Sequence, residues 1–257
     1  MYAHDHLNQD NLQRDIFLAD KKEKSALAAL IDQTLLRPDA SQDEYTALVE
    51  QAAAHGFRAV CLPSSKVKAA QELLNRICSA NKRPLICTVI GFPHGHACTD
   101  AKVSEVKCSR TQGAMEFDYV QNLGWVRDKM WKALSEEAES LVAAAQGGLV
   151  KVILETSCLS PEEIYESALA AARGGVHVLK TSTGYGTRGA VAEDLTVLSR
   201  VAELIEIERG FKIGIKASGG IKTFEDALRM IRAGATRLGT SGGIALINGQ
   251  TADPNSY

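Results

Sequence analysis

The sequence lacks an excess of charge of either sign. Its 257 residues include 29 Lys or Arg and 31 Asp or Glu, so the formal net charge is −2. A protein that binds nucleic acid generally presents a basic surface to the phosphate backbone. The composition therefore predicts no nucleic-acid partner.

Long apolar runs are also missing. Apolar residues make up 45% of the chain and aromatic residues only 5%, yet no run approaches the ~20 residues that a membrane helix needs. The amino-terminal segment is polar and charged and contains no apolar signal core. We therefore expect a soluble, cytoplasmic protein without a membrane partner.

The six cysteines show no C-x-x-C spacing. This pattern favours neither a zinc knuckle nor a thioredoxin-type redox pair, and reduced thiols fit a cytoplasmic protein. His94 and His96 lie near Cys98, but no further ligand set accompanies them, so we predict no metal site. Cys61 ends an apolar run, and we expect it to be a buried, inert thiol.

Short runs of β-branched and apolar residues are what the sequence does contain, and segments with helical spacing separate them. Continuous apolar runs are typical of strands buried on both faces of a parallel sheet. The eight predicted strands cover residues 30–35, 58–62, 85–90, 115–120, 149–154, 176–180, 211–216 and 236–240.

Three of the helical segments, 41–55, 160–173 and 223–233, begin with a capping pattern and end at glycine. Eight strands alternating with helices predict an α/β fold, a single-domain (β/α)8 TIM barrel. An open doubly wound sheet is the alternative, but no G-x-G-x-x-G follows the first strand and no break separates a second domain. We assign residues 27–247 to the barrel, 1–26 to an amino-terminal arm or extra helix, and 248–257 to a polar tail.

Three lysines lie in or at the end of apolar strands: Lys151, Lys180 and Lys216. Burying an ammonium group is costly unless it is paired or deprotonated. An ion pair that lines the barrel, with Asp118 or Glu155, is one interpretation. The other is a Schiff-base site, because desolvation and a neighbouring ammonium both favour the neutral, nucleophilic amine over an ordinary lysine with a pKa near ~10.4. From the residues alone, either Lys180 or Lys216 could be the nucleophile.

Further polar residues lie near predicted strand ends, where barrel enzymes carry their active sites. Asp118 is either a partner for these lysines or a carboxylate that orders a water for proton transfer. Asp32 and Thr34 either bind a substrate hydroxyl or serve in a turn. The glycine clusters after the last two strands predict a phosphate site, although ordinary tight turns are the alternative; these clusters contain Gly219, Gly220, Ser241 and Gly242.

These residues, in this order, resemble the deoxyribose-phosphate aldolase family. The resemblance runs from residue 31 to about 245 and rests on the phrases IDQTLL (31–36), AVC (59–61), TVIGFPHG (88–95), FDYVQNLG (117–124), LVKVILET (149–156), KTSTG (180–184), KASGG (216–220) and LGTSG (238–242). It implies a class I aldolase that reversibly cleaves 2-deoxy-D-ribose 5-phosphate into D-glyceraldehyde 3-phosphate and acetaldehyde, with no metal or cofactor.

The resemblance also implies roles for residues. Lys180 matches the Schiff-base lysine, Lys216 matches the second lysine that favours its neutral form, and Asp118 matches the carboxylate that transfers protons. Lys151 matches a further lysine near the substrate hydroxyl. The residues that fall at the substrate and phosphate loops are Thr183, Gly184, Gly219, Gly220, Ser241 and Gly242. The partner is then a small phosphorylated sugar, and a homodimer is a possible assembly.

The sequence departs from the family pattern at a few places. Phe117, Tyr119 and Gln121 stand where smaller aliphatic residues are usual, so we expect them to alter the pocket wall. Some family members end in a tyrosine that folds toward the site, and Tyr257 ends this chain, although we expect a disordered tail here. The alternatives are a Schiff-base aldolase of another sugar phosphate or keto acid, and a non-catalytic barrel that binds a sugar phosphate.

Overall fold

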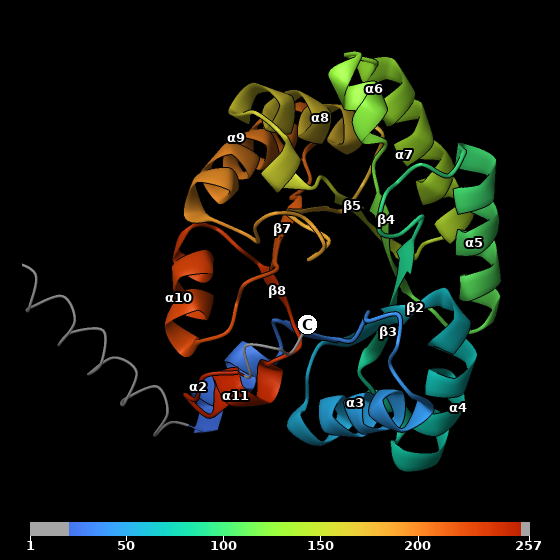
Figure 1. Cartoon of the computed structure of the whole chain (residues 1–257), viewed down its shortest axis with the longest axis vertical. Helices are drawn as coiled ribbons and strands as arrows, with labels where there is room; N and C mark the ends of the chain where they lie inside the picture. Colours follow the sequence, from blue (N-terminus) through green and yellow to red (C-terminus); the bar gives the residue numbers. More distant parts are fainter. Residues whose placement is uncertain (1–20, 253–257) are drawn as a thin grey trace, which may run out of the picture.

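The computed structural model describes residues 21–252 as a closed barrel of eight parallel strands, each paired with the next and the last paired with the first. Figure 1 shows the helices arranged around the outside of the strands in chain order. The strands are β1 (Ile31–Thr34), β2 (Ala59–Pro63), β3 (Leu85–Ile90), β4 (Glu116–Val120), β5 (Leu149–Ile153), β6 (Val178–Lys180), β7 (Gly214–Ser218) and β8 (Arg237–Thr240). The predicted TIM barrel is confirmed, and barrel closure excludes the open sheet.

The outer layer consists mainly of one helix after each strand, with short additional turns. The helices are α2 (Lys21–Ala28), α3 (Gln42–His55), α4 (Val67–Ile77), α5 (Thr99–Thr111), α6 (Leu123–Arg127), α7 (Trp131–Ala145), α8 (Pro161–Arg173), α9 (Ala192–Arg209), α10 (Phe224–Arg232) and α11 (Gly243–Ile247), and 3₁₀ turns cover Ser64–Lys66, Ala80–Lys82 and Thr156–Cys158. No helix in the described part of the chain is long and apolar enough to span a membrane.

The predicted capping patterns do start the helices. Ser41, Ser160 and Thr223 each accept a hydrogen bond from the backbone three residues on and form complete capping boxes. Gly56 ends α3 in the left-handed conformation, with φ of 68°. Local sequence therefore fixes where these helices begin and end.

Two predicted strands are shifted at their ends. The run 211–216 becomes a strand only from Gly214, and the run 176–180 only from Val178. Val176 is nevertheless fully buried, whereas Phe211 is 39% exposed. Apolar character therefore indicates burial but not backbone pairing. The pairing of β6 with β7 begins only where Val178 lies opposite Gly214.

The expected division into an arm, a barrel and a tail stays a prediction. Helix α2 crosses the expected boundary at residue 26, and the barrel helices continue to Ile247. Ala252, in the expected tail, is buried, and its backbone N–H donates to the carbonyl of Lys222. Residues 1–20 and Tyr257 lie outside the described residues.

Candidate active site

Lys180 and Lys216 lie directly opposite each other on neighbouring strands, β6 and β7. Residues in register on adjacent strands point to the same face of the sheet, so both side chains enter the barrel interior. Their Nζ atoms lie 2.9 and 2.8 Å from one oxygen, Oδ2 of Asp118. The two lysines therefore share a single carboxylate.

Asp118 also binds the third lysine. It lies opposite Lys151 in the pairing of β4 with β5, and its Oδ1 is 2.7 Å from Lys151 Nζ. One carboxylate thus bridges three ammonium groups in a site that is almost closed to solvent. Lys151 makes the barrel-lining ion pair that the sequence offered as an alternative, and its second partner is Glu116 rather than Glu155.

A second set of ion pairs completes this network on the other strands. Asp32 accepts from Lys216 at 2.5 Å through Oδ2 and from Arg237 at 2.5 Å through Oδ1. Arg237 also reaches Glu116 at 3.1 Å, and Glu116 lies 2.6 Å from Lys151. Each carboxylate thus holds at least two cations, which fixes the lysine side chains in place.

The protonation of this network follows from these pairs. Burial opposes the charged form of Lys151 and Lys216, but Asp118 and the other carboxylates outweigh it, so the pKa of each lysine is raised. Burial likewise opposes the charged form of Asp118, and its three lysine partners hold the pKa of that carboxyl well below its usual range. The Schiff-base interpretation of the sequence expected a neutral amine at Lys180 or Lys216, and for Lys216 the direction of the pKa shift is the opposite.

Charge counting distinguishes Lys180 from the other two lysines. In the network just described, four cations face three carboxylates. Lys151 and Lys216 each contact two carboxylates, whereas Lys180, among the described residues, contacts Asp118 alone. Lys180 is therefore the cation that the network stabilises least.

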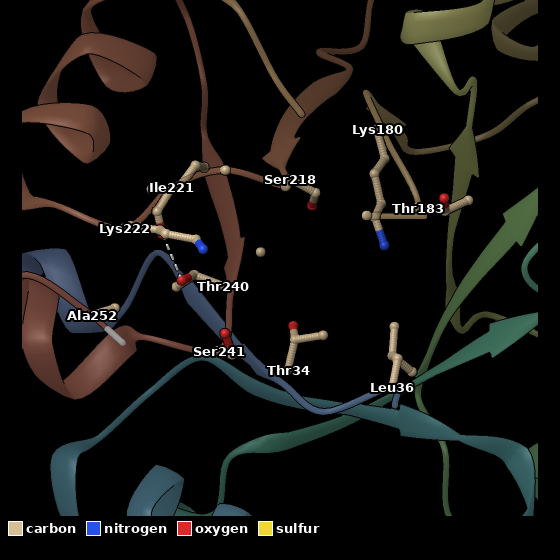
Figure 2. Close-up of a pocket in the computed structure, with 14 residues that line it drawn as sticks. Thr34, Leu36, Lys180, Thr183, Ser218, Ile221, Lys222, Thr240, Ser241 and Ala252 are labelled. Atoms are coloured by element: carbon tan, nitrogen blue, oxygen red, sulfur yellow. Dashed lines mark hydrogen bonds between the residues drawn. The ribbon is translucent and has the colours of Figure 1, made fainter. Parts of the chain in front are cut away.

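A pocket opens at the carboxyl ends of the strands and reaches Lys180. Its volume is about 260 Å³, and its lining comes mainly from the ends of β1, β6, β7 and β8 and the loops that follow them. Figure 2 shows the amino groups of Lys180 and Lys222 facing the same space from two sides, with Thr34 between them. Lys151, Lys216 and Asp118 are fully buried and do not line it.

Glycine is required where this pocket is built. Gly219 and Gly220 have φ of 82° and 74°, and a Cβ on Gly189 would lie 2.1 Å from the Gly219 carbonyl oxygen. On β8, a Cβ at Gly239 would lie 2.3 Å from Ser218 Oγ and 3.0 Å from Lys216 Cε. These glycines let two loops approach closely and leave room for the lysine.

Comparison with known proteins agrees with this geometry. A family model described as "DeoC/LacD family aldolase" matches residues 26–249. The chain belongs to the DeoC/LacD aldolase family.

Curated and solved relatives are similar over most of the chain. The sequence is 44% identical over 223 residues to the deoxyribose-phosphate aldolase of Dictyoglomus turgidum, covering 87% of this chain and 96% of the relative. It is 41% identical over 222 residues to deoxyribose-phosphate aldolase 1 of Cutibacterium acnes, covering 86% and 97%. The solved deoxyribose phosphate aldolase of Aeropyrum pernix, described as a unique tetramer, has a TM-score of 0.79 and 30% identity, covering 90% and 93%.

The structure divides most of the predicted site residues into two groups. Those that line the pocket are Thr34, Lys180, Thr183, Gly184, Gly219, Gly220 and Ser241. Asp118, Lys151 and Lys216 lie in the barrel interior, and so does Asp32, whose oxygens are engaged by Lys216 and Arg237 and not turned to the pocket. Gly242 is buried but outside the lining, and its N–H donates to Thr240 Oγ1.

Sequence reasoning missed three residues of this aldolase site. Lys222 lines the pocket two residues after Gly220, a spacing that could have indicated it. Glu116 and Arg237 complete the interior network from the first buried position of β4 and β8. Only the register of the closed barrel brings these last two together, so no local motif could have found them.

The expectation that Phe117, Tyr119 and Gln121 alter the pocket wall is wrong. Because side chains alternate along a strand, these three point away from the face that carries Asp118. The centroid of the Tyr119 ring lies 6.0 Å from Nζ of Lys102 on α5, and the Gln121 amide donates to the Leu154 carbonyl. The unusual residues therefore pack against the outer layer.

The thiols and histidines lie apart from the pocket lining. Cys61 is fully buried, as expected, and lies opposite Cys87 in the pairing of β2 with β3. A hydrogen bond from Cys87 is the main cause that lowers the pKa of the Cys61 thiol, so inertness stays a prediction. His94 and His96 stack with ring centroids 5.8 Å apart, and in the described part of the chain neither belongs to a cluster of three metal-ligand side chains.

Proposed function

We propose that this protein is a deoxyribose-phosphate aldolase that forms its Schiff base on Lys180. It cleaves 2-deoxy-D-ribose 5-phosphate reversibly into D-glyceraldehyde 3-phosphate and acetaldehyde. The observation that carries this proposal is the position of Lys180, the one member of the lysine cluster whose amine reaches the pocket while Lys151 and Lys216 stay enclosed and paired.

The charge arrangement explains why Lys180 can act as the nucleophile. A lysine attacks a carbonyl only as the neutral amine. The network carries one cation more than it has carboxylates, and Lys180 is the cation with a single carboxylate partner. Loss of the Lys180 proton therefore leaves the remaining three cations balanced by three carboxylates.

The reaction needs a proton acceptor and donor beside the Schiff base. The Lys180 amine adds to the sugar aldehyde and water leaves, which gives a protonated imine. Cleavage of the bond between C2 and C3 of the sugar releases the C3 hydroxyl proton and leaves an enamine, which takes up a proton at C2 before water frees acetaldehyde. Asp118 and Lys216, which lie at the Lys180 amine, are the groups that carry these protons, with a water.

The phosphate of the substrate is assigned to the opposite side of the pocket. Gly219, Gly220 and Ser241 offer backbone N–H groups and a hydroxyl there, and Lys222 adds an ammonium group. Charge-assisted hydrogen bonds of this kind are strong and directional. They would fix the sugar with its aldehyde end at Lys180.

Borohydride trapping tests the proposal directly. Wild-type protein incubated with deoxyribose 5-phosphate and sodium borohydride should gain the mass of a reduced adduct on the peptide that contains Lys180. Lys180→Met should show neither adduct nor turnover, and Lys216→Met should fold but turn over far more slowly. An adduct on Lys216 or Lys151, or no adduct during turnover, would disprove the assignment.

A Schiff-base aldolase of another sugar phosphate is the second candidate, because the family model spans DeoC and LacD aldolases. A panel of sugar phosphates assayed for aldehyde release separates the two. A non-catalytic sugar-phosphate binding barrel would be stabilised by the sugar phosphate without turnover. Activity that persists in a chelator would support metal-free chemistry.

The assembly and the cellular location remain predictions. A homodimer follows only from the family resemblance, and the Aeropyrum pernix relative is described as a tetramer. Sedimentation of the full chain measures the assembly. Location in the cytoplasm rests on the sequence, and fractionation of the source cells tests it.

A further inference from the structure

The loop that follows Lys180 forms part of the pocket wall. It begins at the end of β6, and two of its residues, Thr183 and Gly184, line the pocket. The next residue is Tyr185, which is 45% exposed and does not itself line the pocket. Neither the sequence motifs nor the proposed chemistry gives Tyr185 a role.

Tyr185 joins three loops at the carboxyl end of the barrel. Its hydroxyl donates a 3.0 Å hydrogen bond to the carbonyl of Leu36, which follows β1 and lies 149 residues away in the sequence. Its ring packs edge-on against Phe92, after β3, with centroids 5.6 Å apart. Leu36 belongs to the apolar cluster inside the barrel, and Phe92 packs against that cluster.

The same loop is anchored on its other side by Glu155. The Glu155 carboxylate, which is 5% exposed, accepts from the backbone N–H of Thr183 at 3.2 Å and from the Thr183 hydroxyl. Thr183 Oγ1 in turn accepts from the N–H of Tyr185 at 3.0 Å. Glu155 itself has φ of 54°, a conformation that costs energy for a residue with a side chain. The loop is thus held between two fixed points, Glu155 and Leu36.

This clamp lies on the side of the pocket where the aldehyde donor would be carried. Figure 2 shows Leu36 and Thr183 on the Lys180 side, and Lys222, Thr240 and Ser241 on the other. Under the proposed function, on which this inference rests, the two donor carbons stay attached to Lys180 when the phosphorylated aldehyde leaves. Leu36 lines the pocket on this side, and Tyr185 holds its backbone in place, so Leu36 is the side chain that a donor with one more carbon would approach.

We propose that Tyr185 is a specificity-determining residue that positions Leu36 and so limits the size of the donor aldehyde on Lys180. It acts through Leu36 and the loop and not on the reacting atoms. Because its side chain is half exposed, its replacement removes the clamp without opening the core.

Donor competition in the synthetic direction tests this role. Addition of acetaldehyde and of propanal to D-glyceraldehyde 3-phosphate is measured as kcat/KM in wild type, Tyr185→Phe and Tyr185→Ala. One methylene in an apolar pocket is worth about tenfold or more in discrimination. We expect Tyr185→Ala to raise the ratio of kcat/KM for propanal to kcat/KM for acetaldehyde by about tenfold. Tyr185→Phe, which keeps the ring on Phe92 but loses the hydrogen bond, should give a smaller rise.

The control is Phe211→Ala, a partly exposed aromatic residue that precedes β7 at the opposite end of the barrel. It should leave the donor ratio unchanged. An unchanged ratio in both Tyr185 variants, with normal cleavage of deoxyribose 5-phosphate, would overturn this inference alone. Equal loss of both rates would also overturn it, because it would show a structural role only. Lack of cleavage by the wild type would overturn the proposed function and this inference with it.

Discussion

Replacement of Asp118 by asparagine tests the central ion-pair network. The change keeps the shape of the side chain but removes the one negative charge that bridges Lys151, Lys180 and Lys216 at 2.7, 2.9 and 2.8 Å. The network then holds four cations and two carboxylates in a site closed to solvent. Breaking one buried ion pair typically costs about 3–5 kcal/mol.

The expected losses in stability and in activity can both be estimated. For a chain of this length, about 3–5 kcal/mol corresponds to a fall in Tm of roughly 6–20 °C. Loss of a proton-transfer group typically lowers the rate by about 10²–10⁴-fold. Differential scanning calorimetry measures the first effect, and coupled detection of glyceraldehyde 3-phosphate measures the second. Glu206→Gln, which removes an exposed partner of Lys212, is the control and should change neither.

The loss of unfolding free energy in Asp118→Asn should depend on pH, and the sign of this dependence follows from the pKa of Asp118. The folded-state pKa of Asp118 is far below that of the unfolded chain, so its ion pairs contribute fully above about pH 4. This contribution is lost as the pH falls through the folded-state pKa. The gap in unfolding free energy between wild type and Asp118→Asn should therefore be constant from pH 5 to 8 and narrow below about pH 4. An Asp118→Asn protein with a Tm within 2 °C of the wild type and a turnover rate within threefold of it would refute the reasoning.

Three further variants test other parts of the structure. Lys222→Met should raise KM for deoxyribose 5-phosphate by roughly 10- to 100-fold, since a charge-assisted hydrogen bond is worth about 1.5–3 kcal/mol. It should leave turnover of unphosphorylated deoxyribose unchanged. An equal effect on both sugars would show that Lys222 does not bind the phosphate. Gly239→Ala should lower kcat by about 10²-fold, because the new alanine Cβ would displace the Lys216 side chain. Steady-state kinetics measures kcat, and circular dichroism checks that the variant is folded. A folded variant with the kcat of the wild type would contradict this. Lys102→Met should lower the unfolding free energy by about 3–5 kcal/mol, because it leaves the Glu137 carboxylate buried without its cation. The double variant Lys102→Met, Glu137→Leu should recover most of this loss in urea titrations. If the single and double variants lose the same unfolding free energy, the ion pair is not the cause.

The fold was predictable because its signals are local. Capping residues such as Ser41 and Ser160 act on backbone groups three residues away, and apolar runs identify the eight strands. The ends of β6 and β7 were less predictable, because pairing depends on the neighbouring strand and not on apolar character alone.

The site was predictable only in part. The lysines and Asp118 stand out because charged residues interrupt apolar strands, and the glycine loops carry their own spacing. The contacts of Glu116 with Arg237 join residues 121 positions apart, and those of Tyr185 with Leu36 join residues 149 apart. Contacts of this kind depend on barrel closure, so no pattern within a window of sequence contains them.

The pairing of Lys180 with Lys216 has a consequence for how this chain tolerates insertions and deletions. β6 has three residues, and its last residue lies opposite Lys216. Because side chains alternate along a strand, a slip of one residue would place Leu179 or Thr181 there and turn the Lys180 amine toward the outer helices. Loops on either side of β6 can therefore change in length only where the pairing with β7 is kept. A one-residue deletion inside β6 would remove the site while the barrel's outer helices could still form.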